Sequence, residues 1–241
     1  MKSSQHLKNL SNSSLHGFLL INKPEGVPSF SIVKKIRSLT GVKKVGYAGT
    51  LDPFASGLLI LALGKSYTTQ ISKIHLYPKS YSAQMVLGLE TNTLDSRGSV
   101  ILINPNYDLS KLDHVLHTFK GTITQEPPIF SAKKINGRRA YELARKGHIF
   151  KISPQQITIF NLMISIVETS HFPVIEIQIT CSTGTYIRSL IRDIAKACNT
   201  VGYTKSLVRT KIGPFKLKNA IKLNQLNLNS IQKKLIQKEF C

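Results

Sequence analysis

The chain has 241 residues, with 33 Lys+Arg against 12 Asp+Glu, a formal net charge of +21 at pH 7 and 41% hydrophobic residues. The apolar share excludes a disordered polycation and allows a sizeable core in one large or two small domains. No apolar run reaches the length of a membrane span, and the N-terminus lacks the apolar stretch of a secretory signal. Such an excess of positive charge favours a polyanionic partner.

The cysteines, Cys181, Cys198 and Cys241, are odd in number and form no CxxC pair. This usage fits a reducing compartment, and we expect a cytoplasmic protein that does not enter a membrane. The chain has no Walker-type loop, no GxGxxG and no metal-ligand spacing. We therefore expect neither a metal site nor a nucleotide cofactor.

Residues 1–16 are predicted to be a flexible polar lead-in, and residues 17–22 a buried strand that a turn at 23–26 closes. Ser29 or Ser31 can cap a helix whose apolar positions continue to Leu39, and Gly41 is placed to end it.

Asp52 is the one acidic residue between Glu25 and Glu90. A carboxylate repels phosphate, so its place near a bound polyanion needs a reason. Nucleophilic or general-base chemistry without a cofactor is one such reason. Asp before Pro is also a common helix start, with Asp as N-cap of a short helix over residues 54–59, and the two roles can coexist.

Residues 81–88 are predicted to be a strand and residues 91–98 a polar loop. Ser110 resembles the start of a capping box that opens a helix through Phe119 to Gly121. Residues 127–151 are strongly basic with aromatic residues interleaved, which favours RNA contact over the alternative of a solvated basic helix.

Residues 157–168 and 174–181 are predicted to be strands, and the second alternates apolar and polar positions as a half-buried strand does. A helix follows through Ile194, with Arg188 in its first turn. A cation there opposes the helix dipole, so an anionic partner, a carboxylate or a phosphate, is favoured. We expect an α+β fold with a mixed, largely antiparallel sheet flanked by helices.

Several segments between Gly17 and Phe215, in the same order along the chain, resemble the motifs of the TruB-type tRNA pseudouridine synthases. These enzymes isomerise the uridine at position 55 in the T loop of tRNA. The most specific is GYAGTLDPFASGLL, residues 46–59. The others are NKPEG at 22–26, KSY at 79–81, TNTLDSRG at 91–98, PPIFSA through YELAR at 127–145, CSTGTYIR at 181–188 and LVRT at 207–210.

The resemblance implies a pseudouridine synthase fold in which Asp52 is the catalytic carboxylate and Arg188 pairs with it. Tyr81 would pack on the target base and is a candidate to remove its C5 proton, and Leu207 would line the uracil pocket. Further substrate-binding residues are Tyr47, Tyr186 and Lys23, and Lys23 supports the catalytic loop together with Pro24. The RNA-binding thumb would contribute Lys133, Lys134, Arg138, Arg139 and Arg145.

Two departures from the family pattern matter. Tyr47 stands where bacterial members commonly have His; it can stack but cannot become a cation. Many members also continue into a C-terminal PUA domain. We expect the catalytic domain to span residues 17–215, with a thumb-like insertion at 127–151, and residues 216–241 to be a basic tail without a PUA domain.

The resemblance also implies that the uridine is flipped out of the loop, that no cofactor is needed, and that the T arm of tRNA is the partner. We expect a monomer with no obligatory protein partner. Three alternatives remain: a non-catalytic RNA-binding or ribosome-associated protein, a pseudouridine synthase for another RNA, including a guide-RNA-dependent subunit, and a glycoside-type hydrolase. The last usually needs two nearby carboxylates, which the surroundings of Asp52 do not offer in sequence.

Overall fold

The chain divides into two units, the first built from both ends of the sequence and the second from its middle. The computed structural model describes residues 15–237. The first unit contains the residues up to Tyr77 and those from Val208 onward, and the second runs from Pro78 to Leu207. The expected lead-in lies outside the described residues except for Leu15, which is buried, and His16.

The first unit is a sheet with apolar clusters on both faces. Strand β1 (Gly17–Lys23) pairs antiparallel with β3 (Ser56–Leu63). The opposite edge of β3 pairs with β12 (Gly202–Ile212) near its start and with β2 (Val45–Ala48) near its end. Alternate residues of β1 enter opposite clusters, Leu19 and Ile21 on one face and Phe18 and Leu20 on the other. Burial on both faces explains the unbroken apolar run.

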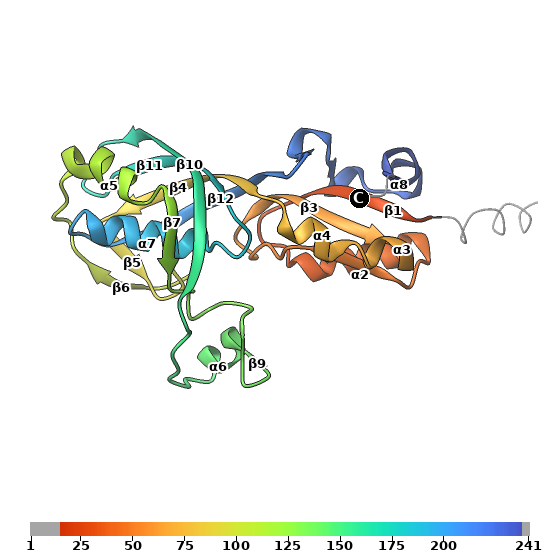
Figure 1. The fold of residues 1–241 in the computed structure, drawn as a ribbon, viewed down its shortest axis with the longest axis horizontal. Helices are drawn as coiled ribbons and strands as arrows, with labels where there is room; N and C mark the ends of the chain where they lie inside the picture. Colours follow the sequence, from red (N-terminus) through yellow and green to blue (C-terminus); the bar gives the residue numbers. More distant parts are fainter. Residues whose placement is uncertain (1–14, 238–241) are drawn as a thin grey trace, which may run out of the picture. The chain divides into compact units, whose positions relative to one another are not determined.

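Helices cover both faces of this sheet. Helix α2 (Ser29–Thr40) and α8 (Leu228–Lys234) contribute to the cluster that contains Leu19. The short helices α3 (Lys65–Thr68) and α4 (Ile71–Leu76) contribute to the other (Figure 1). Gly41 ends α2 as predicted, in the left-handed region with φ 70°. The predicted serine cap is wrong, because Pro28 is the N-cap residue and no side chain caps the helix.

The C-terminal residues are part of the fold rather than the expected tail. Strand β13 (Phe215–Lys216) pairs with β12, and β14 (Ile221–Lys222) pairs parallel with β1. The 3₁₀ turns at Leu217–Asn219 and Leu223–Gln225 connect these pieces to α8. Ile231 of α8 is fully buried, and Ile236 exchanges two backbone hydrogen bonds of 2.8 Å with Phe18. The folded part of the first unit therefore extends beyond residue 215.

The second unit is an antiparallel sheet in which β4 (Lys79–Leu87), β11 (Val174–Cys181), β10 (Gln155–Glu168) and β7 (Gly121–Gln125) follow one another. The predicted strands at 81–88, 157–168 and 174–181 are confirmed. Helix α7 (Ile187–Ala197) packs its apolar stripe inward, and α5 (Leu112–Thr118) contacts it. The hairpin β5 (Leu89–Thr91) and β6 (Val100–Ile103) completes the unit. Asp108 caps the turn before α5, where the sequence pointed to Ser110.

The thumb insertion projects from the second unit between β7 and β10 (Figure 1). It holds the hairpin β8 (Lys134–Ile135) and β9 (Arg138–Arg139) and the short helix α6 (Ala140–Arg145). Asn136 and Gly137 both have positive φ, as a two-residue hairpin turn requires. A continuous basic helix is thus not what these residues form.

The expected fold class is confirmed: the chain is α+β, and its strand pairs are mostly antiparallel with helices against the sheets. Across residues 15–237, none of the helices combines the length and the apolar character that crossing a membrane demands.

Candidate active site

Asp52 lies in the loop between β2 and β3, half-buried in the first unit. Its carbonyl accepts a hydrogen bond of 3.1 Å from the amide of Ala55, which closes a single turn. Strand β3 begins at Ser56, so the short helix expected over residues 54–59 is wrong and Asp52 is not its cap.

The loop is fastened to the segment that leads into α2. The Ser29 hydroxyl donates to the Leu51 carbonyl at 2.9 Å and accepts from the Leu51 amide at 3.0 Å. The Gly26 amide donates to the Pro53 carbonyl at 2.7 Å. The residues on both sides of Asp52 are therefore fixed to the same neighbouring turn. Ser29, predicted as a cap, instead holds the Asp52 loop through Leu51.

Arg209 joins the two ends of this loop. Its side chain is fully buried; Nε donates to the Leu58 carbonyl and Nη2 to the Gly49 carbonyl, both at 2.8 Å. A Cβ at Gly57 would overlap the Arg209 backbone, so glycine permits this close approach of β3 and β12. Arg209 lies within the LVRT motif, for which the sequence predicted a role only for Leu207. The available signal was a cation two residues after Leu207, on the inward-facing side of the strand.

Lys23 is buried behind the loop at the end of β1. Its ammonium donates to the carbonyls of Pro24 and Val27 at 2.9 and 2.8 Å, closing the turn whose Gly26 holds Pro53. Burial lowers the pKa of Lys23 from 10.5 to about 8; Asp52 counteracts this, and Arg209 adds to it. These contacts support the predicted loop-supporting role of Lys23; its predicted contact with substrate stays a prediction.

Tyr47 on β2 is half-buried, and its hydroxyl lies 3.4 Å from the Thr50 hydroxyl. The ring packs on the core cluster that contains Leu19. Tyr47 therefore contacts the Asp52 loop through its hydroxyl. This contact adds a role to the stacking predicted for it.

The remaining predicted pocket residues belong to the second unit. Tyr81 on β4 faces Ile179 of β11, and both Tyr81 and Leu207 are buried. Tyr186 precedes α7, and its backbone is held on both sides by the buried side chain of Gln125. The Tyr186 amide donates to Oε1 at 2.8 Å, and Nε2 donates to the Tyr186 carbonyl at 3.1 Å. Gln125 is a positioning residue that the sequence did not single out.

Arg188 lies in the first turn of α7 with a buried guanidinium. Nη1 donates to the Thr93 carbonyl at 2.8 Å and lies 3.6 Å from the Asp95 carboxylate, and Nη2 donates to the Phe130 carbonyl at 2.9 Å. A carboxylate partner, which the position in the helix favoured, is therefore present in the same unit. The predicted pairing of Arg188 with Asp52 stays a prediction.

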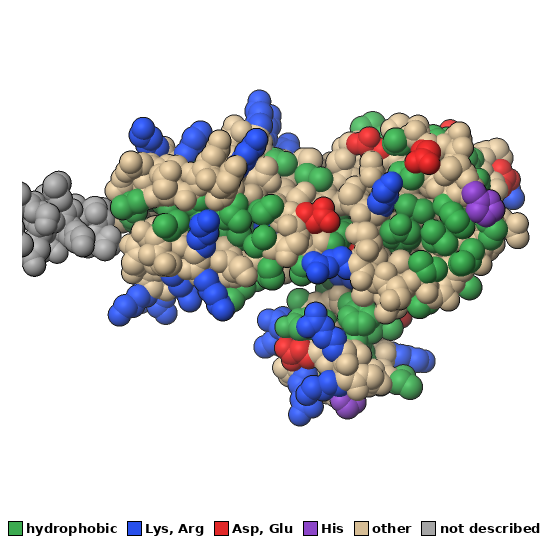
Figure 2. All heavy atoms as spheres, turned by 180° about the vertical axis from the view of Figure 1, so that it is seen from behind, with side chains coloured by type: hydrophobic (Ala, Val, Ile, Leu, Met, Phe, Trp, Pro, Cys, Tyr) green, Lys and Arg blue, Asp and Glu red, His purple; other side chains and the backbone are tan. Residues whose placement is uncertain are grey.

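The basic thumb residues fall into two groups. Lys133 donates to the Ser153 carbonyl at 2.9 Å, and Arg139 donates to the Ala132 carbonyl, so these two brace the thumb. Lys134, Arg138 and Arg145 are exposed, and the Arg145 guanidinium lies 5.6 Å from the centre of the Tyr141 ring. Figure 2 shows Lys and Arg side chains over much of the visible surface of this lobe.

A family model described as TruB family pseudouridylate synthase, N-terminal domain, matches residues 37–187, which include the Asp52 loop and end one residue before Arg188. The chain belongs to the TruB family. It is therefore an isomerase of the pseudouridylate synthase class. The resemblance of its motifs to that family is confirmed.

Relatives within the TruB family match nearly the whole chain. A protein of Protochlamydia amoebophila named tRNA pseudouridine synthase B is 38% identical over 94% of this chain and 86% of its own length. A protein of the same name from Clostridium kluyveri is 41% identical over 92% of this chain and 76% of its own.

Two solved structures have a similar fold. A chain in the structure titled "Crystal Structure of a Cbf5-Nop10-Gar1 Complex" has a TM-score of 0.66 and 26% identity over 87% of this chain. A chain in an H/ACA RNP bound to a substrate RNA has a TM-score of 0.61 and 25% identity over 86%. The present chain spans about half of each, 53% and 51% respectively.

Proposed function

We propose that the protein isomerises uridine 55 in the T loop of tRNA to pseudouridine, with Asp52 as the catalytic carboxylate. The observation that carries the proposal is the Asp52 loop, whose backbone on both sides of Asp52 is fixed by Ser29, Gly26 and Arg209 within a unit of strong positive charge. Relatives that are 38% and 41% identical over more than nine-tenths of the chain bear the name tRNA pseudouridine synthase B, which supports the choice of tRNA.

The reaction breaks the N1–C1′ bond of the uridine and forms a C5–C1′ bond. The proton leaves C5, and N1 gains one, so no oxidant, reductant or group donor takes part and no cofactor is required. Asp52 acts on the ribose by one of two routes: attack on C1′ as a nucleophile, or removal of the 2′ proton to give a glycal. A primary isotope effect with 2′-deuterated uridine distinguishes them, since only the second route breaks the C2′–H bond in the reacting step.

The target uridine is flipped out of the T loop, because C1′ and C5 are inaccessible in the folded loop, at a cost of a few kcal/mol. In this proposal Tyr81 and Leu207 enclose the uracil, and Tyr81 removes the C5 proton directly or through water. Tyr186 lines the pocket, and Tyr47 stacks beside the flipped nucleotide. Arg188 pairs with Asp52 and orients its carboxylate toward the ribose.

The exposed thumb residues Lys134, Arg138 and Arg145 contact phosphates in this proposal, together with the bracing residues Lys133 and Arg139. The protein acts as a cytoplasmic monomer without an obligatory protein partner. Light scattering after gel filtration tests the monomer, both alone and with tRNA. A stable dimer or a requirement for a second protein in the activity assay would contradict this part.

The experiment that tests the function is incubation of the purified chain with an unmodified T-arm hairpin, followed by mapping of pseudouridine at the target uridine. A hairpin with cytidine at that position is the control. We expect product on the first hairpin only. The structural similarity to chains from H/ACA complexes makes a different RNA the alternative substrate class. Binding without product, or product on other RNAs but not on the T arm, overturns the tRNA assignment.

A further inference from the structure

The C-terminal segment forms an ordered edge of the first unit and carries no acidic residue from Val208 to Gln237. Lys222 on β14 lies opposite Asn22 of β1, one residue before the buried Lys23. The chain then passes through α8 and returns to the same edge of β1, where Ile236 pairs with Phe18. The segment therefore runs along β1 from the end beside the catalytic loop to the far end.

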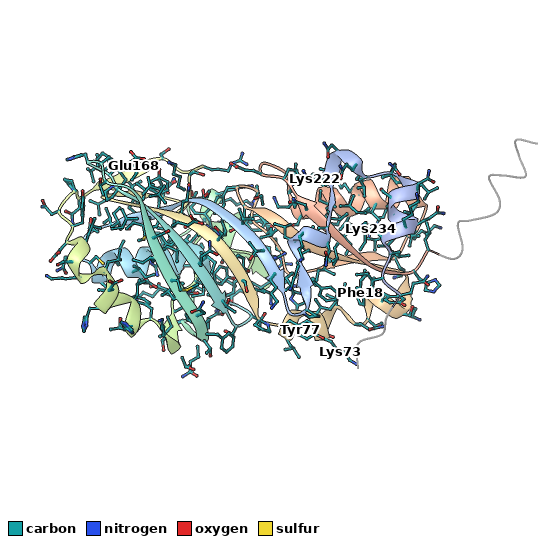
Figure 3. The ribbon with its side chains drawn as sticks, turned by 90° about the horizontal axis from the view of Figure 1, so that it is seen from above. Phe18, Lys73, Tyr77, Glu168, Lys222 and Lys234 are labelled. Carbon is teal, nitrogen blue, oxygen red and sulfur yellow. The ribbon has the colours of Figure 1, made fainter. Side chains whose placement is uncertain are left out.

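Three exposed lysines, Lys222, Lys233 and Lys234, mark the two ends of this path, and Figure 3 labels Lys222 and Lys234 on it. We call them the lysine track. The β1 positions beside its two ends, Asn22 and Phe18, are about 14 Å apart at ~3.4 Å per residue. That span is comparable with a few phosphates along one strand of a nucleic acid, at ~3.4 Å each for a duplex.

The backbone that carries the lysine track is held rigidly, so the track differs from a flexible basic tail. Ile221 precedes Lys222 and is buried in the same core cluster as Ile231, two residues before Lys233. Asn227 and Ser230 form a capping box at the start of α8, with hydrogen bonds of 2.9 and 3.0 Å. The lysine side chains thus project from a fixed backbone.

The surroundings leave this charge unneutralised. Among the described residues of the first unit, the acidic side chains are Glu25 and Asp52, and both lie at the catalytic-loop end of β1. Exposed Lys34 and Lys35 lie on α2, which shares its core cluster with α8. Positive charge without neighbouring acidic side chains attracts an anionic polymer.

We propose that the lysine track binds the phosphate backbone of the RNA substrate beyond the flipped nucleotide, as an extension of the catalytic-loop site. The inference rests on the proposed function for the identity of the RNA, while the chemistry it requires is a run of phosphates. Each lysine that replaces a counterion at a phosphate makes affinity depend on salt. The thumb and the track would then hold the RNA at separate places.

The experiment compares the wild type with a Lys222→Gln, Lys233→Gln, Lys234→Gln variant on an unmodified tRNA transcript across a salt series. The slope of log affinity against log salt should flatten by roughly 2–3 in total, from about 0.7–0.9 for each contact. The single-turnover rate at saturating RNA should stay unchanged. Replacement of the same three lysines by Arg should keep the slope, because it keeps the charge.

The matched control neutralises Lys111, Lys120 and Lys196, which are exposed in the second unit outside the thumb. This variant has the same net charge as the first, so a loss of slope in both shows a general charge effect and overturns the track. An unchanged slope in the first variant, with wild-type pseudouridine formation, also overturns it. Failure of the wild type to form pseudouridine contradicts the proposed function instead, and the two failures are thereby distinct.

Discussion

The two units carry the basic excess of the chain in different ways. The first unit has 18 Lys+Arg against three Asp+Glu, and the second has 15 against nine. Within the second unit, the thumb insertion has seven Lys+Arg and one acidic residue, so the rest has eight of each. The positive charge is therefore concentrated in the first unit and in the thumb, and the body of the second unit is neutral.

In the proposed function, the two units therefore have different tasks: the first unit and the thumb attract the RNA by charge, and the body of the second unit forms the walls of the uracil pocket. The neutral body of the second unit supplies Tyr81, Tyr186 and Leu207, and it balances the buried Arg188 with Asp95. The first unit places the proposed catalytic carboxylate in the most positive part of the chain. Long-range charge speeds encounter with a polyanion, whereas a base pocket needs apolar walls.

The largest effect is expected for Asp52, the carboxylate that the first unit is proposed to supply to the reaction. Replacement by Asn keeps the shape of the side chain but removes the nucleophile or base, so turnover should fall by at least about 10²–10⁴-fold. RNA binding should be equal or slightly tighter, because a negative charge near phosphates is lost. Single-turnover kinetics and a filter-binding titration measure the two effects. Turnover within a few-fold of wild type would remove the catalytic assignment.

Arg188 tests whether the second unit contributes to chemistry. Arg188→Met should lower the rate by about 10²–10³-fold, as loss of a preorganised donor does. Binding should change modestly. Arg188→Lys should also be poor, because an ammonium cannot replace the fork that serves Thr93, Phe130 and Asp95.

Arg188 also has a structural partner, so the control is Asp95→Asn, which breaks the observed ion pair without removing the guanidinium. If both variants lose activity and thermal stability equally, Arg188 acts only by holding the 91–98 loop. A rate loss confined to Arg188→Met supports the proposed contact with Asp52.

Arg209 tests whether rigidity of the catalytic loop matters as much as its charge. Arg209→Lys keeps a cation but cannot bond Leu58 and Gly49 together, so kcat should fall roughly 10–100-fold through misplacement of Asp52. KM should change little, since the buried side chain is not proposed to contact RNA. Thermal unfolding identifies simple destabilisation. A normal kcat in a folded Lys variant would show that the loop keeps its shape without the clamp.

Lys23 tests the electrostatics of the first unit through pH. Its pKa is about 8 in the folded chain against an ordinary value of 10.5, so the unfolded chain binds more protons between these values. Its contribution to stability should therefore rise from pH 8 to 10.5 and be lost as the pH falls through about 8. Denaturant unfolding of wild type and Lys23→Met across this window measures the difference.

A second variant fixes the sign of that effect. Asp52 raises the pKa of Lys23, so Asp52→Asn should make the rise in stability begin at a lower pH, while its upper end stays near 10.5. A curve for wild type that runs parallel to Lys23→Met at every pH would mean that the buried ammonium has an ordinary pKa.

The smallest effect is expected at Tyr47. Tyr47→Phe should lose only the contact with Thr50 and remain within a few-fold of wild type, and Tyr47→His should also be active. Tyr47→Ala should weaken binding of the flipped nucleotide by about 1 kcal/mol, the low end of base stacking on aromatic residues. Measurement of KM for the three variants checks this order. A Phe variant as impaired as Ala would show that the hydroxyl contact is the important one.

Strong periodicity made much of the fold predictable. The apolar run at 17–22, the alternation at 174–181 and the helical spacing before Gly41 each specify one type of element, and the structure contains all three. Strand β2 and much of β12 were not predicted from the sequence. Strand β12 mixes Lys, Thr and Ser with few apolar residues, so it lacks a clear strand pattern. The elements of the C-terminal segment were not predicted either, because each is short and forms only against other parts of the first unit.

The candidate site residues that lie in a motif could be predicted from the sequence. The residues that act through hydrogen bonds to distant parts of the chain could not. Asp52 stands out by charge alone. Ser29 and Gln125 act on backbone groups of distant residues, at sequence separations of 22 and 61, which no local pattern contains. For Ser29 the local pattern offered a helix cap, and for Gln125 it offered no role, although Gln125 ends strand β7. In the structure both side chains instead hold distant backbone groups.

The pairing of Ile236 with Phe18 sets an order of events during synthesis. The second unit is one continuous stretch, Pro78–Leu207, and can fold as soon as it leaves the ribosome. The sheet edge and loop clamp of the first unit also need Arg209, β14 and α8, which are synthesised after the whole of the second unit. We therefore expect the second unit to fold before the Asp52 loop is fixed, because that loop needs Arg209 and the pairing of Ile236 with Phe18 completes the sheet edge of the same unit.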